Sequence, residues 1–220
     1  MKGLQLFILA ILTLSLTSCF EIIEDITINK NGTGKIKLII NASQSKTDIN
    51  ALMLLKEVNG YEVPSIQKIN TKLKSLTDSI ANTKGFSNVT SSFDTDNFII
   101  VVEADFDKVA RLNNGIFKLW NRYDSQNAIE EPYFSYSNNS FYRQSGKLFN
   151  LLYLRLKTAD RKVLDGATYT ALYRFDELIE SQKNALAIIS KNQKVVFLKL
   201  PVEKLIENAT NWNNTITLKP

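Results

Sequence analysis

The sequence predicts an α+β fold in which a mainly antiparallel sheet is built from hairpins and three or four helices pack on it. Runs of β-branched and aromatic residues come in pairs around short turns. Apolar stripes with helical spacing lie between these pairs. Strands and helices do not alternate strictly, as a parallel sheet of βαβ units would require. The chain lacks repeats and Pro/Gly-rich linkers, which favours one compact unit.

Residues 21–41 show the clearest hairpin signal. Two β-branched runs flank Asn31-Gly32, a dipeptide typical of tight hairpin turns. Alternate positions of the first run are isoleucine except at Glu24, which interrupts an otherwise apolar face. In the second run, Lys35 and Lys37 alternate with apolar residues. One face of this hairpin should therefore be solvated and the other buried.

Two helices are expected next. Thr47-Asp48 can cap a helix that ends near Asn59-Gly60. Pro64-Ser65 opens a longer helix that Gly85 stops. Its apolar stripe is narrow and suits packing on the protein's own sheet: Ile66, Ile69, Leu73, Leu76 and Ile80.

The rest of the chain continues in blocks. Residues 147–165 fit either a buried strand or a short helix. The remaining expected elements are a strand pair at 86–93 and 97–105, a helix after Asp105 or Asp107 that Trp120 and Tyr123 close, a strand at 169–175, a hairpin at 185–190 and 195–200, a helix at 201–208 and a last strand at 215–218.

Residues 132–143 hold the densest aromatic cluster. Asn138-Asn139 can adopt the positive φ values of a two-residue turn, which would place Tyr136 opposite Phe141. The aromatic side chains could stack on sugar rings or lie at a membrane interface. We favour the interpretation that they form the core face of a hairpin that leaves one or two tyrosines exposed. The candidate ligand or partner surface consists of Tyr133, Tyr136, Phe141 and Tyr142.

Composition argues against most catalytic chemistry. The chain has no histidine and one cysteine, so disulfides, histidine-based proton transfer and the usual zinc sites are excluded. Its net charge of +5 is spread among interleaved acids and lysines, which does not indicate nucleic-acid binding. Ser43-Gln44-Ser45-Lys46 matches the S-x-x-K of penicillin-binding enzymes, but the companion motifs are absent. We expect no enzyme activity, cofactor or metal, and a helix start at Ser43 and Ser45.

The N-terminal residues carry the one specific motif. Lys2 precedes an apolar run of about 13 residues, which suits an export signal and is too short to span a bilayer. Leu16-Thr17-Ser18-Cys19 resembles the lipobox of bacterial lipoproteins. The resemblance implies cleavage between Ser18 and Cys19 and acylation of Cys19. Residues 1–18 would then be a signal peptide, and residues 19–220 a single domain anchored to the membrane.

The layout of the chain resembles uncharacterised envelope lipoproteins of the Bacteroidota, in which a cysteine leads directly into an x-Asn-Gly-x-Gly hairpin. Usage rich in Asn, Lys and Ile also resembles that group. Phe20 replaces the aspartate that retains proteobacterial lipoproteins at the inner membrane, which favours the outer membrane. With no spacer after Cys19, the domain should sit against the bilayer.

Two functions remain open. The first is a non-catalytic envelope lipoprotein that binds a partner protein or scaffolds at the membrane. The alternative is a binder of lipid or another hydrophobic ligand, with a pocket between the sheet and the helix at 64–83.

Overall fold

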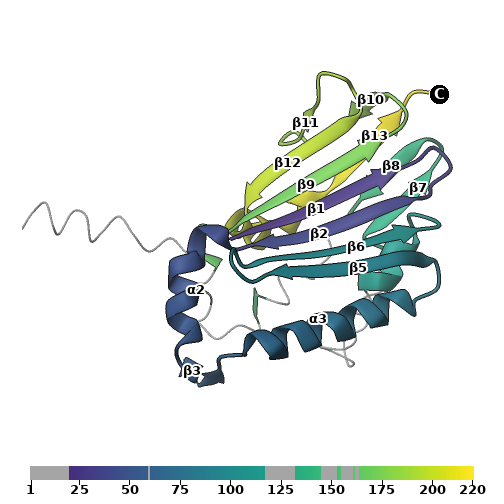
Figure 1. Cartoon of the computed structure of the whole chain (residues 1–220). Coiled ribbons are helices and arrows are strands. Elements are labelled where there is room, and N and C mark those ends of the chain that lie inside the picture. Colours follow the sequence, from purple (N-terminus) through teal and green to yellow (C-terminus); the bar gives the residue numbers. More distant parts are fainter. Residues whose placement is uncertain (1–19, 59, 117–131, 145–152, 155–160, 162–163) are drawn as a thin grey trace, which may run out of the picture.

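The computed structural model describes residues 20–58, 60–116, 132–144, 153–154, 161 and 164–220. The described chain forms a seven-stranded sheet, a four-stranded sheet and a small two-stranded hairpin, together with short helices (Figure 1). The predicted α+β class is confirmed. The predictions for Ser18, Cys19 and most of 147–165 lie outside the described residues.

The large sheet is antiparallel except where β1 and β9 pair in parallel. Its strands are, in spatial order, β11 (Ile188–Ile189), β12 (Val195–Pro201), β9 (Thr168–Phe175), β1 (Glu21–Ile28), β2 (Gly34–Asn41), β6 (Ile99–Phe106) and β5 (Phe86–Asp94).

The predicted first hairpin is confirmed, with Ile28 of β1 opposite Gly34 of β2. The turn between them needs a glycine, because Gly32 has a φ of +81°. Gly34 is also required, since a Cβ there would lie 1.9 Å from the carbonyl oxygen of Thr27.

The second sheet has four antiparallel strands in the order β10 (Ile179–Gln182), β13 (Asn214–Leu218), β8 (Ser140–Arg143) and β7 (Phe134–Ser137). Asn138 and Asn139 take φ values of 49° and 55°, and Tyr136 pairs with Phe141 as predicted. The sequence did not predict β10, because only Ile179 in this four-residue strand is a buried apolar residue.

The core lies between the two sheets. Phe141 of the small sheet contacts Tyr173 and Phe175 of β9, with ring centroids 5.1 and 6.0 Å apart. Ile26 and Ile28 of β1 are fully buried on the same side. The aromatic face of the predicted hairpin is therefore part of the core.

The other described elements are helical. They are α2 (Lys46–Met53), α3 (Ile66–Ala81), α6 (Val202–Glu207), the 3-10 turns η1 (Ser43–Ser45) and η3 (Ala209–Trp212), and a helical segment at 111–116. The start of α3 is as predicted, because the Ser65 side chain accepts a hydrogen bond from the backbone N–H of Lys68. Helix α3 packs against β5, and the Thr77 and Ser91 hydroxyls lie 2.7 Å apart.

Helix α2 is shorter than predicted. It ends at Met53, and the chain then forms the hairpin of β3 (Glu57–Val58) and β4 (Tyr61–Glu62). Gly60 has a φ of +83°, so it turns the chain of this hairpin instead of closing a helix.

The seven-stranded sheet has two ends that matter below. At the proximal end, β1 begins at Glu21, between Asn41 of β2 and Thr168 of β9. The β1–β2 turn lies at the opposite, distal end. Helix α2 lies across the proximal end of the sheet (Figure 1).

Candidate ligand pocket and the buried ion pair beside it

A polar pocket of about 710 Å³ opens at the end of the small sheet next to η3. Its walls come from the end of β8, the chain after β10, η3 and the start of β13. This volume falls within the range of small-molecule sites in proteins, about 300 to 1,000 Å³.

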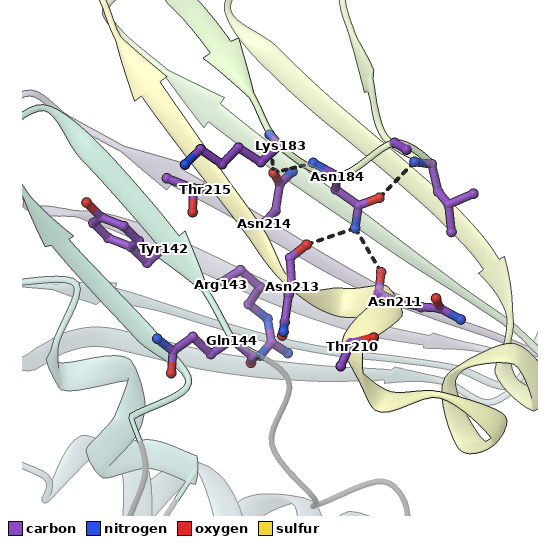
Figure 2. Close-up of a pocket in the computed structure, with 12 residues that line it drawn as sticks. Tyr142, Arg143, Gln144, Lys183, Asn184, Thr210, Asn211, Asn213, Asn214 and Thr215 are labelled. Carbon is purple, nitrogen blue, oxygen red and sulfur yellow. Dashed lines mark hydrogen bonds between the residues drawn. The ribbon is translucent and has the colours of Figure 1, made fainter.

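Two buried asparagines build one wall of this pocket (Figure 2). Asn184 donates from Nδ2 to the carbonyl oxygens of Asn211 and Asn213, and its Oδ1 accepts from the N–H of Leu186. Asn214 Oδ1 accepts from the N–H groups of Lys183 and Asn184, both at 3.0 Å. Because their polar atoms are used in this way, Asn184 and Asn214 hold the segment 183–186 against the segment 211–214.

Other polar side chains of the pocket remain available to a ligand. Tyr142 and Thr215 are half-buried partners on adjacent strands, and Gln144 and Lys183 are exposed. The side chains of these four residues make no hydrogen bond to another described residue. None of the pocket's twelve described lining residues is acidic. The pocket therefore suits a neutral or anionic polar group, with donors and acceptors on several sides.

Arg143 lines the pocket and is only 3% exposed. Its Nε and Nη2 atoms lie 3.3 and 3.4 Å from the two carboxylate oxygens of Glu24, and Nη1 donates to the carbonyl oxygen of Gln144. The guanidinium also lies over the rings of Phe134 and Trp212, at 4.5 and 4.6 Å from their centroids. A buried charge needs such partners, because water no longer solvates it.

Tyr173 completes this buried cluster by donating a hydrogen bond of 2.8 Å to Glu24. Burial, followed by the negative charge of Glu24, raises the pKa of Tyr173 well above its usual value. The pKa of Tyr169 is raised for the same two reasons. Burial alone would lower the pKa of Arg143, but the charge of Glu24 together with Tyr173 and Tyr169 outweighs it, and the pKa is raised. The arginine therefore stays charged and both tyrosines stay protonated across the physiological pH range.

A second, apolar cavity of about 140 Å³ lies on the other side of Glu24, under the C-terminal end of α3. Besides Glu24 its walls are apolar: Ile36, Leu38, Ile80, Phe86, Val102, Ala104, Leu112, Gly115, Ile116 and Phe134. An apolar cavity of about 150 Å³ can hold benzene. This one suits an apolar group of that size.

The four aromatic residues of the predicted surface lie in three different places in the structure. Tyr133 and Phe141 are 2% and 0% exposed, so the surface prediction is wrong for these two, because they fill the core between the sheets. Tyr136 packs against the Gly32 turn at the distal end, and its hydroxyl donates to the carbonyl oxygen of Lys30. Tyr142 lines the polar pocket.

Sequence reasoning missed the rest of the pocket. Its residues come from 142–144, 183–186 and 210–215, segments that meet only after the small sheet has formed. Asparagine is common along the whole chain, so Asn184 and Asn214 give no distinct signal.

The S-x-x-K serine lies in η1, where its N–H donates to the side chain of Asn41, and Lys46 begins α2. The predicted helix start is confirmed there. The described residues contain no group of three acidic, cysteine or histidine side chains placed to hold a metal. They also contain no helix with the length and apolar character needed to cross a bilayer.

No protein-family model matches the chain, and no curated protein matches it. Among solved structures, the chain is similar to the folded domain of LppM from Mycobacterium tuberculosis, determined by NMR. The match has 12% sequence identity and a TM-score of 0.38, and it covers 90% of this chain and 89% of that one. A likeness at this level assigns neither a family nor a function.

Proposed function

We propose that the protein is a non-catalytic lipoprotein of the cell envelope that binds a polar partner in the pocket beside Arg143. The pocket is the observation that carries this proposal: it has the volume of a ligand site, four available polar side chains and no acidic residue among the described residues that line it. The partner it fits is a neutral or anionic polar segment, such as part of a glycan or a peptide.

The membrane anchor rests on the lipobox-like Leu16-Thr17-Ser18-Cys19. Strand β1 begins at Glu21, so acyl chains on Cys19 would hold the proximal end of the sheet at the bilayer. Two or more acyl chains anchor a protein stably, whereas one chain holds it only transiently. Labelling with a palmitate analogue tests this step, since Cys19→Ala should remove the label.

Photo-crosslinking in intact cells tests the pocket. A photoreactive phenylalanine at Tyr142 should give adducts whose mass identifies the partner as glycan, peptide or lipid. The matched control is the same residue at Phe197, an aromatic on β12 that is 37% exposed and lies outside the pocket. Lys183→Ala and Gln144→Ala should weaken the adduct at position 142. Equal adducts at both positions, or none at 142, would count against the proposal.

The apolar cavity favours a second function, the binding of a small hydrophobic group such as the end of an acyl chain. Ala104 lines this cavity and is 2% exposed, so Ala104→Val should occupy part of the space. Benzene is a suitable probe: it should shift the methyl NMR signals of Leu38 and Leu112, and the shifts should shrink in Ala104→Val. Unchanged signals on saturation with benzene would eliminate this function.

A further inference from the structure

Apolar side chains gather on the surface at the end of α2. Leu52, Leu54 and Leu55 are 42%, 87% and 51% exposed, and Tyr61 of the following hairpin is 48% exposed. Isolated apolar residues on a protein surface are ordinary, whereas three exposed leucines within four positions of the chain are not isolated.

Helix α2 has little to hold it to the rest of the protein. None of its residues is buried, and it spans only eight residues, Lys46–Met53. A helix of that length is marginal in water unless tertiary packing stabilises it. An apolar medium outside the protein would supply the missing contacts.

The position of α2 indicates what that medium is. Asn41, the last residue of β2, pairs with Glu21 at the start of β1, and α2 begins a few residues later. Cys19 lies two positions before Glu21, and two residues span at most about 7 Å. Acyl chains on Cys19 would therefore keep this end of the sheet within reach of the lipid headgroups. Helix α2 lies across the strands (Figure 1), and interfacial helices lie in the plane of the membrane.

We propose that the end of α2 and Tyr61 insert into the interfacial layer of the bilayer to which Cys19 is anchored. This rests on the proposed lipid anchor and adds a second, non-covalent contact that orients the domain. Tyrosine is enriched at membrane interfaces, and leucine contributes burial energy there. Exposed charges of both signs flank the leucines: Lys46 and Lys56 against Asp48 and Glu57. Apolar burial therefore drives the contact, which should depend little on anionic lipid.

The chain's single cysteine makes a direct test practicable. Once Cys19 carries its thioether-linked lipid, Leu54→Cys introduces the sole free thiol, which can carry an environment-sensitive fluorophore. The lipidated full chain is reconstituted in phosphatidylcholine vesicles, with flotation recorded for each sample. Leu178→Cys is the matched control, an exposed leucine just after β9 at the distal end.

We expect a blue-shifted emission at position 54 that brominated lipid quenches, and water-like emission at position 178. The result at position 54 should be the same in vesicles with anionic lipid. Water-like emission at position 54 in protein that floats with the vesicles would overturn this inference and leave the anchor standing. A blue shift that brominated lipid does not quench would also overturn it, since another protein surface would then cover the leucines. Failure to float would overturn the anchor, and the inference with it.

Discussion

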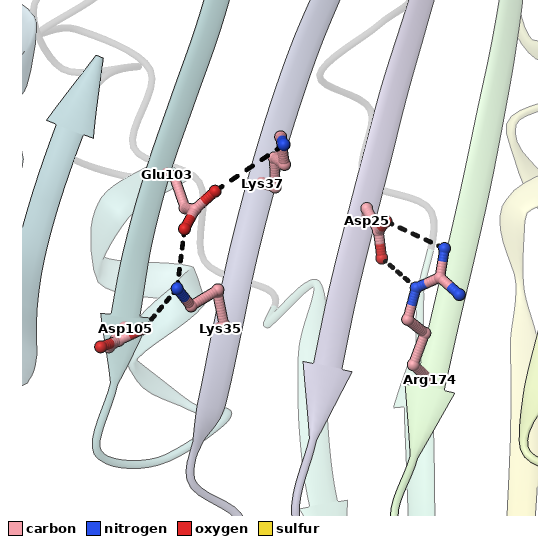
Figure 3. Close-up of polar contacts among 6 residues, drawn as sticks. All are labelled: Asp25, Lys35, Lys37, Glu103, Asp105 and Arg174. Carbon is pink, nitrogen blue, oxygen red and sulfur yellow. Dashed lines mark hydrogen bonds and ion pairs between the residues drawn. The ribbon is translucent and has the colours of Figure 1, made fainter.

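Glu24 and Asp25 are neighbours on β1, and each pairs with an arginine, yet they lie on opposite faces of the seven-stranded sheet. Glu24 faces the core, where its partner Arg143 is 3% exposed. Asp25 faces solvent, where Arg174 approaches it with two hydrogen bonds of 2.9 and 3.1 Å and stays partly exposed (Figure 3). The outer pair has the shorter contacts.

The comparison shows that contact distance does not determine what an ion pair contributes. Water solvates both members of the outer pair when they separate, so such a pair contributes about 0 to 1 kcal/mol. On the inner face no water replaces a lost partner, and a remaining charge is left uncompensated. Lys35, Lys37, Glu103 and Asp105 form a similar solvated cluster on the outer face (Figure 3).

The largest effect is expected from Arg143→Ala. This change leaves the buried Glu24 without its cation and should lower the free energy of unfolding by about 3 to 5 kcal/mol. Urea unfolding followed by circular dichroism measures it. The double variant Glu24→Leu with Arg143→Met is the control, because it removes both charges and should recover most of the loss. A double variant as unstable as the single one would show that ring packing on Arg143, not charge, dominates.

A smaller effect is expected from Tyr173→Phe, which removes one hydrogen bond to the charged Glu24 and should cost about 1.5 to 3 kcal/mol near neutral pH. It should also change the alkaline limb of the stability curve. The pKa of Tyr173 is raised in the folded state, so above about pH 10 the unfolded chain loses a proton that the folded chain keeps. Stability then falls as pH rises, by about 1.4 kcal/mol per unit for each such tyrosine.

Unfolding free energies between pH 9 and 11 test this alkaline effect. Tyr173→Phe removes one of the two buried tyrosines with raised pKa, and Tyr169 remains. The slope with pH should therefore be shallower in the variant but not zero. Parallel curves for the two proteins would contradict the prediction.

The buried pair also marks how far the sequence could be interpreted. Period-2 alternation identified the inward face of β1 correctly, and Glu24 stood out as its one interruption. Its partner Arg143 lies 119 positions later, in a different sheet, and nothing local links the two. The interruption was therefore visible, but its physical reason required the three-dimensional structure.

Elsewhere in the chain, too, local signals predicted individual elements but not the long-range contacts between them. Turn chemistry at Asn138-Asn139 set the second hairpin and its register, because a two-residue turn fixes the strand pairing. Asn31-Gly32 located the first hairpin, whose loop runs over the five residues between Ile28 and Gly34. The parallel contact of β1 with β9 and the division into two sheets were not predictable, since both depend on long-range packing. The pocket is formed by segments that are far apart in the sequence and meet through this long-range packing. Of its residues, the sequence singled out only Tyr142.

The smallest effect is expected on the outer face, from Asp25→Asn. Arg174 keeps 43% of its side chain exposed, so water and salt take over the lost interaction, and the change in unfolding free energy should stay below about 1 kcal/mol. Raising the salt concentration should reduce this difference further, because mobile ions already screen the wild-type pair. Asp25→Asn keeps the shape of the side chain, which separates charge from packing, and Arg174→Gln is the reciprocal control. If either variant lost as much stability as Arg143→Ala, solvation would not be what distinguishes the two faces of β1.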